Sequence, residues 1–206
     1  MSSARETSSR AWSEFGSGAE RGALAIQDAL TKQDVLPEPD AGSTVDGMRY
    51  VELHCKSNFS FLCGAAHPDE LVSRAADLGY AGLAITDSES LAGVVRGFGA
   101  ARDLGFKYIV GSEVHPIDAP SMVLWPTDRD AYGRLCALLS RGRMRCEKGQ
   151  CELRWSDVDE FSEGLIAGAY AAPESQGERP DLTTEFLRGA FRDVFTDSGY
   201  LLTALH

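Results

Sequence analysis

The chain has 206 residues, of which 43% are hydrophobic, and its formal net charge is −11. This length predicts one domain with room for a tail, and the apolar fraction is sufficient for a packed core. The acidic charge argues against autonomous DNA binding, because a phosphate backbone is held by lysine and arginine. No apolar run is long enough to span a membrane and no secretory leader opens the chain, so we expect a soluble cytoplasmic protein.

The five cysteines give an odd number and form no CxxC pair. This pattern does not predict a structural zinc site of the finger or ribbon type. We expect reduced thiols, most of them buried.

Residues 1–47 differ in composition from the rest of the chain. They are rich in Ser, Gly, Ala, Glu and Asp, and Pro37 and Pro39 interrupt them. We predict a flexible tail over residues 1–47 and a folded domain over residues 48–206. Met48 lies immediately before the first strand pattern, so an alternative start there is a second interpretation.

From residue 49 onward, strand and helix patterns alternate. The predicted strands cover residues 50–54, 81–86, 107–110, 121–125, 164–171 and 200–205. The predicted helices begin at Pro68 and end before Gly79, and then cover residues 91–104, 128–141 and 183–195. Repeated β–α units favour parallel strands with right-handed crossovers, either as a barrel or as an open doubly wound sheet. In both architectures functional residues gather at the carboxyl ends of the strands.

Polar residues close several of the predicted strands. His54, Asp87 and Glu113 end the first three, Ser121 precedes the fourth, and His206 ends the last. An imidazole and two carboxylates at a common edge could bind a divalent metal that activates water against a phosphate. The alternative is that they are ordinary polar groups at strand ends.

Two other features favour a plain structural interpretation. Gly93, Gly97 and Gly99 lie inside a helical pattern rather than between a strand and a helix, so they do not predict a phosphate loop. The basic run Arg141–Lys148 is interpreted as a solvated loop, with contact to a phosphate backbone or a partner as the alternative.

Three segments together resemble the PHP domain (polymerase and histidinol phosphatase type). They are Tyr50–Ala65, Leu83–Val95 and Ile109–Val114, and Asp128–Leu139 is similar to the next helix in bacterial polymerase alpha subunits. The amino-acid sequence of the first segment is most similar to the PHP domain at the N-terminus of bacterial error-prone DNA polymerases. The resemblance implies an α/β fold, a distorted β/α barrel whose active members hold up to three metals and cleave phosphoesters.

The family's metal ligands are only partly present. The positions that match are His54, Asp87, Glu113 and, in a looser alignment, His206. The ligand positions that are substituted are Lys56, Cys63, Ser88 and Ser121. Since a protonated ammonium cannot ligate a metal and a hydroxyl is a poorer ligand than imidazole, we predict no trinuclear site and no phosphoesterase activity. At most, residual manganese or zinc would bind.

The resemblance also implies that the barrel is incomplete at its C-terminal end. The family's last motif and the polymerase palm, fingers and thumb are not found within these 206 residues, so this chain alone is not expected to polymerise DNA. A fragment, a truncated gene product and one half of a split protein are the interpretations. Our first hypothesis is a degenerate, structural PHP domain of an error-prone DNA polymerase, which acts in replication and damage-tolerant repair synthesis. Its partners would be the rest of the polymerase chain or other replication and repair proteins, with DNA reached only through that polymerase. The alternatives are a stand-alone metal-dependent phosphoesterase and a non-enzymatic interaction module.

Overall fold

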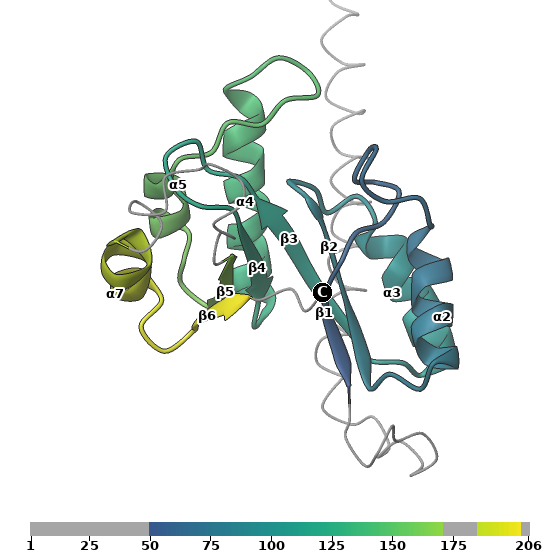
Figure 1. Ribbon diagram of the computed structural model, residues 1–206. Helices are drawn as coiled ribbons and strands as arrows, with labels where there is room; N and C mark the ends of the chain where they lie inside the picture. The colour runs from purple at the N-terminus through teal and green to yellow at the C-terminus, as the bar shows by residue number, and fades with distance from the viewer. Residues whose placement is uncertain (1–49, 171–184, 203–206) are drawn as a thin grey trace, which may run out of the picture. The chain divides into compact units, whose positions relative to one another are not determined.

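The computed structural model describes residues 50–170 and 185–202, which form a single mixed sheet with helices against it (Figure 1). The strands are β1 (Val51–Cys55), β2 (Gly82–Ser88), β3 (Tyr108–Val114), β4 (Met122–Pro126), β5 (Leu165–Tyr170) and β6 (Gly199–Leu202). The helices are α2 (Pro68–Asp77), α3 (Val94–Leu104), α4 (Arg129–Met144), α5 (Trp155–Glu160), the π-helix η3 (Leu187–Phe191) and α7 (Arg192–Val194). The predicted tail 1–47 and His206 lie outside the described residues.

The six strands lie in the sheet in the order in which they occur along the chain. Strands β1, β2 and β3 are parallel, and β5 is parallel to β6, as the β–α pattern predicts. The prediction of parallel strands is wrong for β4, which is antiparallel to both β3 and β5. Residues 115–121 are too few for a helical crossover, so the chain reverses there as a hairpin.

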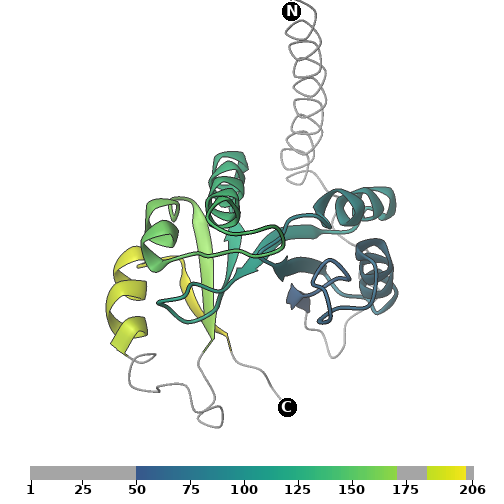
Figure 2. The same cartoon turned by 90° about the horizontal axis from the view of Figure 1, so that it is seen from above.

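Helices cover the outer face of the curled sheet in two groups (Figure 2). The first group is α2 and α3, whose core contains Val72 and Ala101 and packs against Leu83 and Ile85 of β2. The second group packs against β4 and β5, and its fully buried residues include Leu135 of α4. Strands β2 and β4 are buried at nearly every position, because one face of each packs against helices and the other faces the inner cluster.

Several helix ends agree with the sequence prediction. Pro68 is the first residue of α2, and Gly79 follows that helix with a φ of 73°. Gly105 caps α3 with a φ of 62°, a left-handed conformation that favours glycine. Helix α3 begins at Val94 rather than at residue 91, and the short helix α5 has no counterpart in the sequence prediction.

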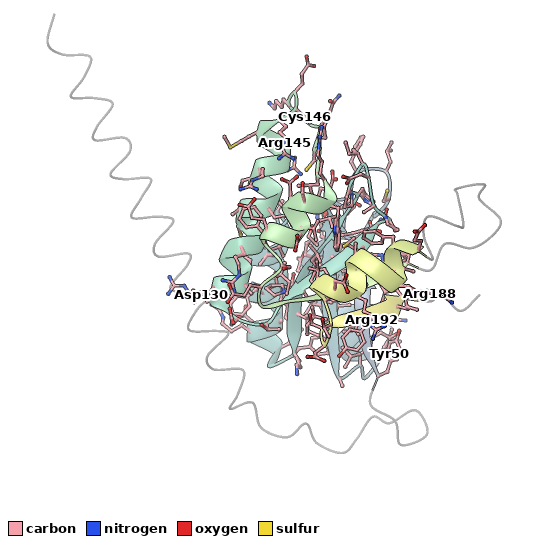
Figure 3. All side chains as sticks on the ribbon, turned by 90° about the vertical axis from the view of Figure 1, so that its left-hand side faces the viewer. Tyr50, Asp130, Arg145, Cys146, Arg188 and Arg192 are labelled. Atoms are coloured by element: carbon pink, nitrogen blue, oxygen red, sulfur yellow. The ribbon has the colours of Figure 1, made fainter. Side chains whose placement is uncertain are left out.

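The interpretation of the basic run as a solvated loop holds for residues 145–150, which form a mostly exposed turn, and is wrong for Arg141 and Arg143, which lie in helix α4. Helix α4 continues to Met144, and Figure 3 labels Arg145 at its C-terminal cap. The Arg145 guanidinium forms a two-pronged ion pair with the buried carboxylate of Asp157, one of its bonds being 2.7 Å long. Arg141 contacts Asp157 at 3.5 Å and pairs with Glu160 at 2.8 Å. These arginines therefore fix α5 to the end of α4.

Candidate functional site

Successive side chains along a β-strand point to opposite faces of the sheet, so the polar residues at the strand ends are divided between the inner face and the helical face. Ala84 of β2 lies in a small inner cluster with Val123 and Trp125 of β4. Ser88, four residues after Ala84 in the same strand, has the inward direction, and the parallel register pairs it with Glu113 of β3. Asp87 alternates with Ser88 and therefore points to the helical side of the sheet. The site at the carboxyl ends of the strands is thus divided.

Glu113 is the centre of the inward-facing group, and only 5% of it is exposed. Its Oε2 atom lies 2.5 Å from Lys56 Nζ and 3.3 Å from His115 Nε2, and it accepts a hydrogen bond of 3.0 Å from Ser88 Oγ. His54 Nε2 lies 4.0 Å from Glu113 Oε1. We refer to these five residues as the Glu113 cluster. It brings together residues of all three predicted motifs.

Burial and hydrogen bonding within the Glu113 cluster shift the pKa values of three of its members. Burial of Glu113 favours the neutral acid, but hydrogen bonds from His115 and Lys56, with their positive charges, outweigh burial and lower its pKa to about 2. The same hydrogen bond to Glu113 raises the pKa of His115. Burial lowers the pKa of His54. Near neutral pH the cluster therefore holds an ionised carboxylate that does not act as a general acid.

His54 is oriented by contacts across the inner face. Its Nδ1 atom lies 2.6 Å from Thr86 Oγ1, and its ring makes an edge contact with the ring of Tyr170, with centroids 5.7 Å apart. Trp125 of β4 donates a hydrogen bond of 3.0 Å from Nε1 to the carbonyl oxygen of Leu53. The end of β1 is thus fastened to the opposite side of the curled sheet, which fixes the position of the imidazole.

His115 is a member of the cluster that the sequence prediction missed. It follows Glu113 by two residues, so the period of a β-strand gives both side chains the same direction. That spacing was a usable signal. His115 Nδ1 also lies 2.8 Å from the hydroxyl of Ser121, a predicted ligand position in which serine replaces histidine. Ser121 therefore supports a member of the cluster, His115.

Asp87 has a different role from Glu113. It is 2% exposed, and it accepts hydrogen bonds from the Ser57 amide at 2.8 Å, the Ser57 hydroxyl at 2.7 Å and the Ser60 hydroxyl at 2.6 Å. Its carboxylate is therefore occupied by the loop that follows β1. Cys63 lies in the same loop, and its side chain is exposed. The structure brings His54 and Glu113 together, whereas Asp87 is directed into this loop.

The residues that are present do not fit the family's multinuclear metal centre. In the described part of the chain, no three His, Cys, Asp or Glu side chains are arranged to hold a metal ion. The Lys56 ammonium lies where a cation would approach Glu113 Oε2, and Ser88 supplies a hydroxyl beside it. The arrangement is that of a buried ion pair with supporting hydrogen bonds. No catalytic step through a metal follows from it.

The fold and the partly substituted cluster at its strand ends define a class of protein. The PHP domain family model matches residues 52–197, and the chain belongs to this family. This confirms the resemblance drawn from the sequence motifs. Within residues 50–170 and 185–202, no helix is long and apolar enough to cross a membrane.

The relatives specify the branch of the family. The chain is 65% identical over 167 residues to an error-prone DNA polymerase of Rhodopirellula baltica, an alignment that covers 79% of this chain. It is 56% identical over 104 residues, half of this chain, to an error-prone DNA polymerase of Methylococcus capsulatus. The matched regions span only 15% and 10% of these relatives. The similarity therefore concerns the PHP region of a much longer kind of protein.

Solved structures support the fold. A protein from Bifidobacterium adolescentis, assigned as a metal-dependent phosphoesterase, is similar with a TM-score of 0.57 and 18% identity, covering 80% of this chain and 78% of its own. An amidohydrolase from Chromobacterium violaceum gives a TM-score of 0.52 at 18% identity, covering 74% and 75%. The PHP-type barrel predicted from the sequence is confirmed, in the form of a curled, mixed sheet. At this identity the likeness concerns the fold alone.

Proposed function

We propose that this chain is a structural PHP domain of an error-prone DNA polymerase. The observation that carries the proposal is the Lys56–Glu113 ion pair, with 2.5 Å between Nζ and Oε2, at the carboxylate that resembles the family's bridging ligand. A lysine here supplies one positive charge to a buried acid without offering a coordination site. The domain would then support a longer chain that performs template-directed nucleotidyl transfer during damage-tolerant synthesis.

Two consequences of the geometry favour a structural role over a stand-alone phosphoesterase. First, the Glu113 carboxylate already receives Lys56, His115 and Ser88 as partners, so a metal would have to displace a charged group. Second, the Asp87 carboxylate receives its hydrogen bonds from a loop and supports that loop. The partners of the domain would be the remaining parts of the polymerase chain, which would also make the contacts with DNA.

Metal content and hydrolysis test this proposal together. The purified chain is incubated with manganese or zinc, desalted and analysed by elemental mass spectrometry, and hydrolysis of a model phosphodiester is measured. We expect well under one metal per chain and no hydrolysis. The variant Lys56→His with Ser88→His should increase metal retention, whereas Lys107→His, at an exposed lysine, should not. Near-stoichiometric metal with hydrolysis by the unmodified chain would establish the phosphoesterase alternative instead.

A further inference from the structure

The loop between β1 and α2, residues 56–67, can be followed in Figure 1. Its tip carries exposed apolar side chains. Leu62 is 90% exposed, Phe61 84% and Phe59 42%. These three side chains lie within four consecutive residues of one loop, and Phe59, the least exposed of them, lies near Gly93. Contiguous exposed apolar groups of this kind mark surfaces that bind other molecules.

The tip is held on a rigid support. The Asn58 amide donates to the Ala66 carbonyl at 2.8 Å, and the Gly64 amide donates to the Ser60 carbonyl at 3.0 Å. A Cβ atom on Gly64 would lie 2.2 Å from the Ser57 carbonyl oxygen, so this close passage of the backbone requires glycine. Beneath the loop, the buried Asp87 carboxylate accepts hydrogen bonds from Ser57 and Ser60. The loop therefore presents the tip in a fixed conformation.

The backbone at the tip is also strained. Leu62 has a φ of 63°, a left-handed conformation that is uncommon for a residue with a bulky side chain. Strain of this kind persists where the surrounding contacts impose it, and it is concentrated at binding and functional segments. A preorganised apolar tip loses little conformational entropy when it is buried, which favours binding. Its chemistry indicates an apolar protein surface as the ligand.

The size of the exposed apolar area indicates whether the bound surface belongs to a separate protein or to the same polypeptide. A stable complex between free proteins buries about 800 Å² on each partner. Three side chains expose roughly half of that area or less, since even a whole aromatic side chain buries about 150–250 Å². A patch this small is insufficient for a free partner or a second copy, but it is sufficient for a surface on the same polypeptide, where tethering gives a millimolar effective concentration. The relative in R. baltica has room for further domains, because the matched region is 15% of its length.

We propose that Phe59, Phe61 and Leu62 dock this domain onto another domain of a polymerase-length chain. This inference rests on the proposed function, and it assigns to the loop after β1 the role of an interdomain contact. Asp87 is then a positioning residue for that contact, because it fixes the loop from below.

Cys63 provides a native probe, since it is an exposed free thiol next to Leu62. Trypsin cleavage after Lys56 and Arg74 gives a peptide, residues 57–74, in which Cys63 is the only cysteine. Isotope-coded alkylation would be measured in the 206-residue chain and in a fusion where this chain replaces the matching region of the R. baltica polymerase. We expect alkylation of Cys63 to be about tenfold slower in the fusion. Leu104→Cys, on the exposed end of α3, is the matched control and should react equally in both proteins.

The double variant Phe61→Ser and Leu62→Ser completes the test. In the fusion it should restore rapid alkylation of Cys63, and in the isolated chain it should leave the circular dichroism and melting temperature unchanged. Equal reactivity of Cys63 in the unmodified chain and fusion overturns the docking inference. Slower alkylation at higher concentrations of the isolated chain overturns the assigned partner and indicates a second copy.

Primer extension by the fusion separates this inference from the proposed function. An active fusion with an unprotected Cys63 overturns docking alone and leaves the polymerase assignment in place. An inactive fusion with a protected Cys63 supports docking and counts against the proposed function.

Discussion

Removing the Lys56 ammonium should destabilise the domain, because the buried negative charge of Glu113 would lose its nearest positive charge. The variant Lys56→Met keeps the length of the side chain and deletes its charge. The pKa of Glu113 lies at about 2, compared with 4.5 in its reference state. At about 1.4 kcal/mol per pH unit, this difference corresponds to roughly 3 kcal/mol of stabilisation near neutral pH from all partners together. Since His115 remains, we expect Lys56→Met to cost about 2 kcal/mol.

Urea unfolding followed by far-UV circular dichroism measures this loss, and its pH dependence identifies the carboxylate. Because the folded pKa of Glu113 is depressed, its contribution is present above about pH 4.5 and is lost as the pH falls toward 2. In Lys56→Met this acid-dependent loss should be smaller. The additional change Glu113→Gln should recover part of the stability, because it removes the uncompensated charge.

Lys107→Met is the matched control, since this lysine is exposed. Its urea midpoint should equal that of the unmodified chain. An unchanged midpoint and acid dependence in Lys56→Met would refute the reasoning that this ion pair stabilises the strand ends. The reasoning would also be refuted if the loss of unfolding free energy in the double variant Lys56→Met with Glu113→Gln equalled the sum of the losses in the two single variants.

Three further predictions concern other parts of the fold. The hydrogen bond to Glu113 raises the pKa of His115, so this interaction stabilises the fold below about pH 6.5 and is lost as the pH rises through the raised pKa. The difference in urea midpoint between the unmodified chain and His115→Gln should therefore shrink with increasing pH. Asp157→Asn should lower the melting temperature because it leaves the Arg145 pair incomplete, and an unchanged melting temperature would show that these arginines do not fix α5. Gly64→Ala should destabilise the domain by on the order of 3 kcal/mol because its Cβ would meet the Ser57 carbonyl oxygen. Gly99→Ala, in an open position of α3, should instead be neutral or stabilising by up to about 1 kcal/mol, and equal effects of the two glycine changes in urea unfolding would contradict the loop geometry.

Much of the fold follows from local patterns in the sequence. The start of α2 at Pro68 and the glycines after α2 and α3 were predictable, because proline and glycine constrain the backbone directly. The antiparallel direction of β4 was not predicted, since the rule of β–α repetition was applied to a connection too short for a helix. The role of Arg145 was missed for another reason: its partner, Asp157, lies in a helix that periodicity did not reveal.

For the site, the sequence alone determined which chemical groups are available. It showed that lysine and serine occupy positions where the family has metal ligands, and it placed His54, Asp87 and Glu113 at strand ends. This was sufficient to predict a substituted phosphoesterase site, because side-chain chemistry does not depend on the fold.

Only the tertiary structure decided how these groups are paired. The register of β2 and β3 places Ser88 beside Glu113, and a register irregularity in β1 lies just before Lys56, which reaches the same carboxylate. Alternation in β2 directs Asp87 away from that cluster and into the support of an exposed loop. These pairings join residues far apart in the chain, and a shift of one residue in strand register would exchange the two faces. The sequence therefore specified the groups, and strand pairing determined which of them meet.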